Sequence, residues 1–251
     1  MEKALNSTSL KSFCFLVFYN FRSAIIGVHP KTRIFHPQYL VNEHLRKTVK
    51  SKFISRLSEN GHVRILDVGC GLKPYQYLAP SADWFGIDVI EGPSVDLVID
   101  GSSKWELGDN TFDAILCTEV LEHAVSPELV IEEIWRVLKP NGIALITSPF
   151  VYGVHGEPSD FRRYTQFGLV KAVDRFQVSE FGMLGGIGSA IGVCFNSWLT
   201  VTLYRNVWLR VITIPLSWIL FGATNLLSKL LDSIDTTDSF GTNTWITVCK
   251  C

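Results

Sequence analysis

A glycine-rich turn preceded by an aspartate is the first feature of this sequence that could do chemistry. Residues 65–75 read ILDVGCGLKPY, so Gly69 and Gly71 follow an apolar run that contains Asp67. Glycines at such a turn let the backbone approach a ligand closely. A dinucleotide fingerprint needs a third glycine, and Pro74 stands in its place, which disfavours NAD or FAD as the ligand.

Two more aspartates follow the next two strand-like runs. Asp88 ends one run and Asp100 follows the other. A carboxylate at the position of Asp88 can accept hydrogen bonds from both hydroxyls of a ribose, and Asp100 is placed to meet the edge of an adenine. Each aspartate alone is equally typical of a turn. Three of them at the ends of successive strands favour an adenosine-containing ligand.

A polar loop, VYGVHGEPSDFRRYT over residues 151–165, carries candidates for proton transfer. A histidine beside a carboxylate is a reasonable general base. His155 is equally typical of a loop histidine bonded to the backbone, and we expect Arg163 to pair with Asp160 or Glu157 rather than with a substrate. The candidate catalytic residues are His155, Asp160, Tyr164 and, in the earlier sequence LEH, His123.

The elements that must position these residues follow from periodicity. Apolar residues at helical spacing predict helices over residues 37–58 and 127–138, and Thr165 is placed to cap a third helix over 166–173. Alternating or continuous apolar runs predict strands. Their ranges are 63–68, 84–89, 95–99, 112–117, 143–147, 176–181 and 244–250.

Strands that alternate with helices predict an α/β fold with a mostly parallel, Rossmann-like sheet covered by helices on both faces. Ligands of such sheets bind outside the carboxyl ends of the strands. The turns that hold the three aspartates are therefore where the ligand is expected.

Composition and charge narrow the class of protein. The chain has 251 residues, of which 47% are hydrophobic and only 19% charged, so it is more apolar than a typical soluble enzyme. Its six cysteines are scattered and predict neither a zinc site nor a disulfide framework, and no metal is expected. The apolar run over residues 13–21 is too short and too interrupted for a secretory signal, so we expect a cytoplasmic location.

Two segments stand apart from the predicted core. Residues 1–60 carry ten lysines and arginines against three glutamates, which is typical either of a solvated helix or of a segment that touches anionic lipid or nucleic acid. Residues 181–204 and 211–228 contain no charged residue. Each run approaches or exceeds the roughly 18–20 residues that span a bilayer.

Five stretches in the predicted core resemble the class I S-adenosylmethionine-dependent methyltransferases, in the type 11 or quinone-methyltransferase-like branch. They are VRILDVGCG, FGIDV, VIDGSS, FDAILCTEVLEH and RVLKPNGIALITSP, in that order over residues 63–149. The resemblance implies a seven-stranded sheet and S-adenosylmethionine as the cofactor. It also implies that the last strand lies between the fifth and the sixth.

The resemblance assigns roles to residues at the ends of the strands. Asp67, Gly69 and Gly71 would line the methionine part of the cofactor, Asp88 the ribose, and Asp100 with Gly101 the adenine. Residues 117–119 would form the floor near the sulfonium. Many relatives have another glycine where this chain has Leu72-Lys73-Pro74, and Lys73 could pair with the cofactor's carboxylate or simply be solvated. The full expected set is Asp67, Gly69, Cys70, Gly71, Lys73, Asp88, Val89, Asp100, Gly101, Cys117, Thr118 and Glu119.

The order of strands sets the expected domains: a basic helical segment over 1–60, a methyltransferase core over 61–184 and 241–251, and an apolar helical insertion over 185–240. An insertion between two strands of one sheet has both ends on one side of a membrane, so it crosses twice or not at all. It could span the bilayer, lie in its interface or cap the active site, and we expect association with the cytoplasmic face of a membrane.

The leading hypothesis is methyl transfer to an oxygen or carbon of a lipid, isoprenoid or lipid-linked glycan. The alternatives are a non-catalytic membrane scaffold with the same fold and a methyltransferase for a soluble small molecule. A nucleic-acid partner is not expected, because the chain has Cys117-Thr118-Glu119-Val120 where amino-methylating enzymes carry an Asn/Asp-Pro-Pro-aromatic signature. A nicotinamide oxidoreductase is disfavoured by Pro74.

Overall fold

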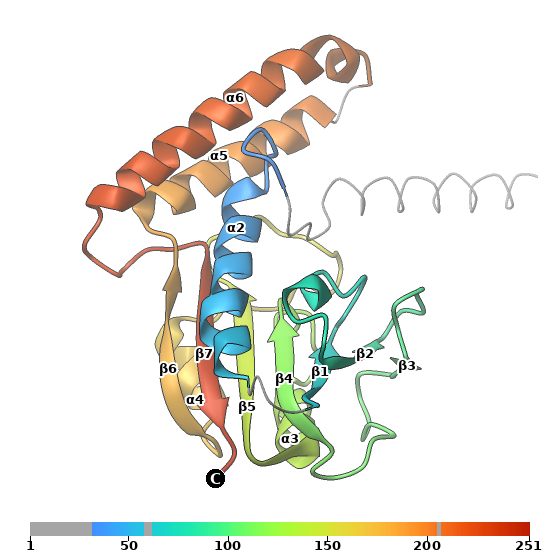
Figure 1. The fold of residues 1–251 in the computed structure, drawn as a ribbon. Coiled ribbons are helices and arrows are strands. Elements are labelled where there is room, and N and C mark those ends of the chain that lie inside the picture. Colours follow the sequence, from blue (N-terminus) through green and yellow to red (C-terminus); the bar gives the residue numbers. More distant parts are fainter. Residues whose placement is uncertain (1–31, 58–61, 205–206) are drawn as a thin grey trace, which may run out of the picture.

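The structure is a computed structural model that describes residues 32–57, 62–204 and 207–251 (Figure 1). Within these residues the centre is a seven-stranded sheet of order β3-β2-β1-β4-β5-β7-β6. Its strands are β1 (Arg64–Val68), β2 (Asp83–Asp88), β3 (Leu97–Val98), β4 (Phe112–Thr118), β5 (Leu138–Pro149), β6 (Gln177–Leu184) and β7 (Asn243–Cys249).

Strands β1 to β5 pair in parallel, and β7 runs antiparallel to both β5 and β6. The pairing of Ile146 in β5 with Ile246, and of Ile246 with Phe181 in β6, fixes the register of the last strand. The prediction of a Rossmann-like sheet, with its last strand between the fifth and the sixth, is confirmed.

The sheet has a core on each face because successive side chains of a strand point to opposite sides. In β1, Leu66 and Val68 join the core beneath α3 (Pro127–Val137) and α4 (Gln166–Ala172). Ile65 joins the core beneath α2 (Tyr39–Thr48), which continues through η1 (Val49–Phe53) and η2 (Ile54–Arg56). Asp67 shares a face with Ile65, so its carboxyl lies on the α2 side.

The connection from β6 to β7 forms two long antiparallel helices, α5 (Ile187–Tyr204) and α6 (Val207–Ile234), which lie above the sheet in Figure 1. They pack closely at Gly188, where an added Cβ would lie 2.3 Å from the Ser228 carbonyl oxygen. Asp232 and Asp235 near the end of α6 accept backbone hydrogen bonds from the first turn of α5. These bonds satisfy amide donors that a helix start otherwise leaves unpaired.

A buried amide pair holds this helical hairpin on the segment before α2. Asn225 donates to the carbonyls of Ile34 and His36, at 2.6 and 3.0 Å. Asn196 donates to Asn225 Oδ1 at 2.9 Å and to the Pro37 carbonyl at 3.1 Å. Because both amides are fully buried, their hydrogen bonds fix the orientation of the hairpin.

The hairpin exposes large apolar side chains. On α5 these include Ile191, Phe195 and Trp198, and on α6 Leu216, Trp218, Ile219, Leu227 and Leu230. A surface this apolar is typical of a face that meets a partner or a lipid surface.

Among the described residues, no helix has both the length and the hydropathy that crossing a bilayer requires.

The expectation of a basic N-terminal segment is only partly testable. Residues 1–31, including the apolar run at 13–21, and residues 58–61 lie outside the described part. Within residues 32–57, basic side chains pair with acids: Arg46 and Lys47 with Glu43, and Lys52 and Arg56 with Glu180. These four cations are therefore ion-paired within the protein.

Candidate functional site

The glycine turn after β1 has a conformation that side chains would hinder. Gly69 and Gly71 have φ values of 66° and 48°. A Cβ at Gly69 would lie 2.5 Å from Val120 Cγ2, whereas a Cβ at Gly71 would meet nothing within 4 Å. Gly69 is therefore required by packing, and the open space at Gly71 leaves the backbone free to meet a ligand.

The two carboxylates beside this turn differ in their surroundings. Asp88 ends β2 and accepts hydrogen bonds from Gly71 N at 2.9 Å and Ile90 N at 3.1 Å, one on each oxygen. Each oxygen of Asp88 keeps a lone pair for a further donor. Asp67 is buried, and burial, aided by the charge of Asp88, raises the pKa of its carboxyl well above its ordinary range.

The end of the third strand forms the rim of this edge. Asp100 accepts from Ser102 N at 2.7 Å and from Ser103 N at 2.8 Å, so one of its oxygens stabilises the turn. A Cβ at Gly101, whose φ is 73°, would lie 3.2 Å from a methyl group of the exposed Val89. Asp100 thus acts as a turn former, with its second carboxylate oxygen left to meet a ligand.

Lys73 is placed differently from the expectation. Its ammonium pairs with Asp96 and donates to the Trp84 carbonyl at 3.3 Å, and its side chain is only 8% exposed. These contacts tie the turn to β2 and to the loop before β3, so Lys73 is neither a solvated side chain nor a cation without a partner, and its role toward the cofactor stays a prediction.

The side chains of the two cysteines in the expected site are buried. Cys70 Sγ points at the Ser94 carbonyl, 3.7 Å away, and burial raises the pKa of this thiol to about 12. Cys117 is fully buried in the core on the α3 side, and burial raises the pKa of its thiol too. Neither sulfur is a nucleophile at neutral pH.

Glu119 lies just past the end of β4, after Thr118, with a φ of 57°. Its carboxyl accepts a hydrogen bond from Thr147 Oγ1 at 2.8 Å and one from Asn243 Nδ2 at 2.7 Å. Burial raises the pKa of Glu119 to about 7, against the opposing effect of these two hydrogen bonds. This residue is held rigidly at the middle of the strand edge.

Several buried polar atoms at this edge have no hydrogen-bond partner among the described residues: Asp67 Oδ2, the Tyr75 hydroxyl, Glu122 Oε1 and Asn243 Oδ1. The pKa of the Tyr75 hydroxyl is raised by burial and by the charges of Glu119 and Asp67, which places these groups within electrostatic range of one another. Buried polar groups without partners are rare in native proteins. Their presence beside the open glycine turn fits a polar ligand such as S-adenosylmethionine.

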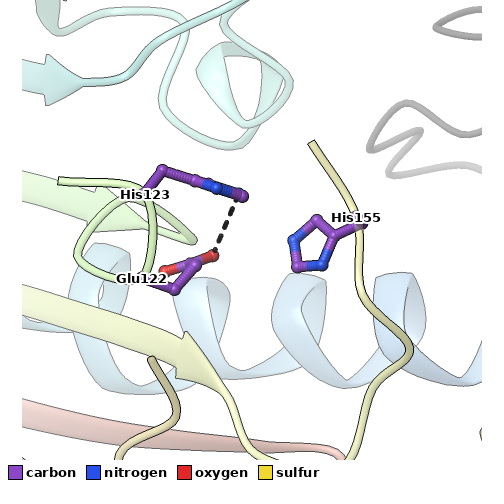
Figure 2. A group of neighbouring side chains, drawn as sticks. All are labelled: Glu122, His123 and His155. Carbon is purple, nitrogen blue, oxygen red and sulfur yellow. Dashed lines mark ion pairs between the residues drawn. The ribbon is translucent and has the colours of Figure 1, made fainter. Parts of the chain in front are cut away.

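A second cluster lies at the same edge and is formed by Glu122, His123 and His155 (Figure 2). The rings of His123 and His155 meet edge to face with centroids 4.8 Å apart. His123 Nε2 lies 3.7 Å from Glu122 Oε1. Glu122 is fully buried, and burial, aided by the charge of Glu119, raises its pKa well above the ordinary value.

Hydrogen bonds at Nδ1 orient both histidines. His123 Nδ1 lies 2.6 Å from the Ser159 carbonyl oxygen. His155 Nδ1 lies 3.2 Å from the Gly153 carbonyl oxygen and 3.3 Å from Asp160 Oδ2. Because these partners only accept, we assign the proton of each neutral ring to Nδ1, which leaves a lone pair on Nε2.

Asp160 holds the loop of His155 in place. It accepts from His155 N at 3.0 Å and from Arg163 at 2.5 and 2.8 Å. The Arg163 hydrogen bond keeps the pKa of Asp160 far below its ordinary value. Burial lowers the pKa of His155, and the charge of Asp160 partly opposes this shift. At neutral pH His155 is therefore an uncharged base, and the expected pairing of Arg163 with Asp160 is present.

The cluster of Glu122, His123 and His155 can do two kinds of chemistry. Its ligand atoms lie within 4.8 Å of one another, so they can hold a metal ion. Two imidazole nitrogens and one carboxylate suit a divalent transition metal. Without a metal, the lone pair at His155 Nε2 can accept a proton from an acceptor hydroxyl. No metal was expected from the sequence.

Tyr164 does not join this cluster. It packs against the core that includes Ile131 and Leu169, and it lines a hollow between α3 and α4. Its backbone carbonyl accepts from Thr244. Burial raises the pKa of its hydroxyl, aided by the charges of Glu128 and Glu122, and a catalytic role for Tyr164 stays a prediction.

Sequence reasoning missed several residues of the site. Glu122 stands beside His123 in the quoted LEH and could have been found from that adjacency. Tyr152, whose ring centroid lies 5.1 Å from that of His155, stands in the quoted loop. Asn243 bonds Glu119 from 124 positions away, a pairing with no local signal.

Comparison with known protein families gives one match. Residues 66–146 match the family described as "Methyltransferase domain". This range contains the glycine turn, the three aspartates, Glu119 and Glu122.

Curated relatives share part of the sequence of this chain. The ubiquinone biosynthesis O-methyltransferase of Photobacterium profundum is 32% identical over 95 residues, which are 32% of this chain and 40% of that protein. The mitochondrial ubiquinone biosynthesis O-methyltransferase of Saccharomyces cerevisiae is 28% identical over 132 residues, which are 45% of this chain and 42% of the relative. The chain therefore spans less than half the length of these relatives.

Solved structures share the fold at low identity. A putative methyltransferase from Bacillus halodurans has a TM-score of 0.51 at 14% identity, covering 80% of this chain and 98% of its own. The cyclase SpnF has a TM-score of 0.53 at 19% identity, covering 82% of this chain and 81% of its own. A fold shared with a cyclase does not by itself define the reaction.

Proposed function

We propose that the core of this chain is a class I S-adenosylmethionine-dependent methyltransferase domain of the type 11 branch, and that the protein transfers a methyl group from this cofactor to an oxygen or carbon of a lipid, isoprenoid or lipid-linked glycan. The match of residues 66–146 to a methyltransferase domain supports the proposal. The observation that carries the proposal is the meeting, at one edge of the sheet, of the open glycine turn and the cluster around His155.

The cofactor is held by the turn and the strand ends. Asp88 receives the ribose hydroxyls on its remaining lone pairs, while Asp67 and the amides near Gly71 face the amino-acid part. Val89 and Gly101 flank the adenine at the rim. When bound, S-adenosylmethionine supplies an electrophilic methyl group.

The chain's own residues position the acceptor and take its proton. Methyl transfer requires an in-line approach of the acceptor atom, so positioning supplies much of the acceleration. For a hydroxyl acceptor, His155 Nε2 takes the proton, and Asp160 holds the ring in the required tautomer. A carbon acceptor needs the same positioning.

The apolar hairpin of α5 and α6 supports a lipid-like acceptor. Its exposed leucines and aromatic residues suit contact with a membrane surface. The curated relatives named for ubiquinone biosynthesis make a quinone-like hydroxyl acceptor compatible with this site. The same surface supports a location at the cytoplasmic face of a membrane.

Radiolabelled methyl transfer tests the proposal. Full-length protein is incubated with S-adenosylmethionine labelled at the methyl group and with a lipid extract, and we expect label in the organic phase that His155→Gln lowers by roughly 100-fold or more. A non-catalytic scaffold predicts no labelled product from any extract.

Flotation with liposomes tests the membrane location separately. We expect the protein to float with vesicles, and Trp198→Glu to reduce the floating fraction because it charges an exposed apolar face. A protein that stays wholly in the soluble fraction while it methylates a water-soluble compound would favour the alternative of a soluble acceptor.

A further inference from the structure

A cavity of about 110 Å³ lies between α2, the loop after β5 and α5. Its wall is mainly apolar, and it includes Val41, Tyr152, Val154, His155, Val193 and Val201. The wall combines α5 of the hairpin with the loop that carries the candidate base.

Two polar side chains of the wall already donate hydrogen bonds within the protein. Gln38 donates from its amide to the Tyr152 hydroxyl at 2.7 Å, and Thr200 donates from its hydroxyl to the Asn196 carbonyl at 2.7 Å. Groups that are already paired offer little to a polar ligand, and apolar cavities favour apolar contents. The cavity therefore suits a hydrocarbon segment.

One end of the cavity meets the candidate site. His155 lines the wall and also belongs to the cluster with Glu122 and His123. Tyr152 links the cavity to the candidate site, because its ring contacts His155 and its hydroxyl accepts a hydrogen bond from Gln38. A molecule with its hydrocarbon part in the cavity has its polar end at His155.

The other end leads to the surface of the hairpin. Val201 of α5 lines the cavity and is 70% exposed. The amide pair of Asn196 and Asn225 keeps α5 in place, so the wall exists before a ligand arrives. A preformed apolar wall that opens at an exposed apolar helix can receive a chain from a lipid surface.

We propose that this cavity binds the apolar chain, isoprenoid or acyl, of an amphipathic methyl acceptor whose polar head lies at His155. The inference rests on the proposed function. The volume corresponds to about four waters of liquid, at about 30 Å³ each, so it holds only the part of the chain next to the head. The rest lies along α5 past Val201.

Binding of a fluorescent fatty acid, 11-(dansylamino)undecanoic acid, to the full chain tests the proposal. We expect saturable binding that farnesol displaces and that Ser197→Phe weakens at least tenfold, because Ser197 lines the cavity. Thr200→Phe is a second variant for the same wall. Ile191→Phe is the matched control, because Ile191 lies on α5 with 56% exposure and does not line the cavity.

The outcomes separate the cavity from its alternatives. Thermal unfolding shows whether Ser197→Phe and Thr200→Phe keep the wild-type fold. If either folded variant binds the probe as tightly as the wild type does, the proposal is overturned. Probe binding that survives in both and is lost in Trp198→Glu would place the chain on the outer surface of the hairpin instead.

Calorimetry with S-adenosylhomocysteine on the same proteins separates this proposal from the proposed function. We expect Ser197→Phe to bind S-adenosylhomocysteine as the wild type does. If the wild type binds none while the probe still maps to the cavity, the proposed function fails and the apolar-chain site stands. If S-adenosylhomocysteine binds and the cavity variants leave the probe unaffected, the cavity proposal alone fails.

Discussion

Replacing Asp160 with asparagine perturbs the candidate base without changing the shape of the side chain. Asp160 Oδ2 lies 3.3 Å from His155 Nδ1 and also accepts from the backbone of His155. At that distance a unit charge stabilises a protonated imidazole by about 1.3 kcal/mol in bulk water and by about 5 kcal/mol at an effective dielectric constant of 20. The His155 ring is partly exposed, so a value near the lower limit applies, and we expect its pKa to fall by about one to two pH units.

The direction of this change is fixed by the surroundings. Burial already lowers the pKa of His155, and Asp160 is the main group that opposes the shift. In Asp160→Asn the positive charge of Arg163 also loses its partner, which lowers the pKa of His155 further. We expect the partly buried Arg163 hydrogen bonds to cost about 2 kcal/mol of stability when their acceptor loses its charge.

NMR titration of the histidine ring protons measures the effect without a methyl acceptor, and His155→Gln identifies the resonance. Urea unfolding measures the loss of stability. Asp113→Asn is a control for general loss of an ion pair, because Asp113 bonds Lys139 and contacts neither histidine of the cluster among the described residues. A pKa of His155 that stays the same or rises in Asp160→Asn would refute the assignment of Asp160 as the residue that holds the base.

Three further results are expected. Gly69→Ala should lower the stability by about 1–2 kcal/mol or more and weaken S-adenosylhomocysteine binding, since a Cβ there meets Val120 at 2.5 Å with φ at 66°; urea unfolding and calorimetry check this. Chelation with EDTA should leave methyl transfer unchanged if His155 acts as a metal-free base; loss of activity that Mn²⁺ restores would assign the histidine cluster to a metal. Burial raises the pKa of Glu119 from 4.5 to about 7, so the folded state binds the Glu119 proton more tightly than the unfolded state does. The free energy of unfolding should therefore be highest below about pH 4.5 and fall by up to roughly 3 kcal/mol as the pH rises to about 7. Glu119→Gln should flatten this pH dependence, which urea unfolding measures.

The order of elements could be predicted because each strand and helix carries its own periodic signal. The type of sheet follows from short motifs near the strand ends and is confirmed, and residues 66–146 match the methyltransferase-domain family that these motifs resemble. One strand is shorter than expected: residues 95–99 form only Leu97–Val98, since the side chain of Asp96 bonds Gly86 N and Lys73 instead of leaving the segment free to pair regularly.

The site was less predictable, because its hydrogen bonds join distant parts of the chain. The sequence gives no local partner for Lys73, but its ammonium pairs with Asp96, 23 positions away. Tyr164 stands near His155 in sequence, yet the backbone carries it to the α3 side. The Glu119–Asn243 bond depends on β7 inserting beside β5, which no local pattern encodes. The domain boundaries and the roles of the individual site residues stay predictions.

Calorimetric titration of the full chain with S-adenosylhomocysteine tests the central claim most directly. We expect one binding event per chain, weakened at least tenfold in Asp88→Ala, since Asp88 holds Gly71 and offers the lone pairs for the ribose. Asp83→Ala is the matched control on the same strand, because Asp83 lies at the other end of β2 and pairs with Arg64 at the surface. Folded wild-type protein that binds no S-adenosylhomocysteine, or binding that Asp88→Ala leaves unchanged, would contradict the assignment of this sheet edge as the cofactor site.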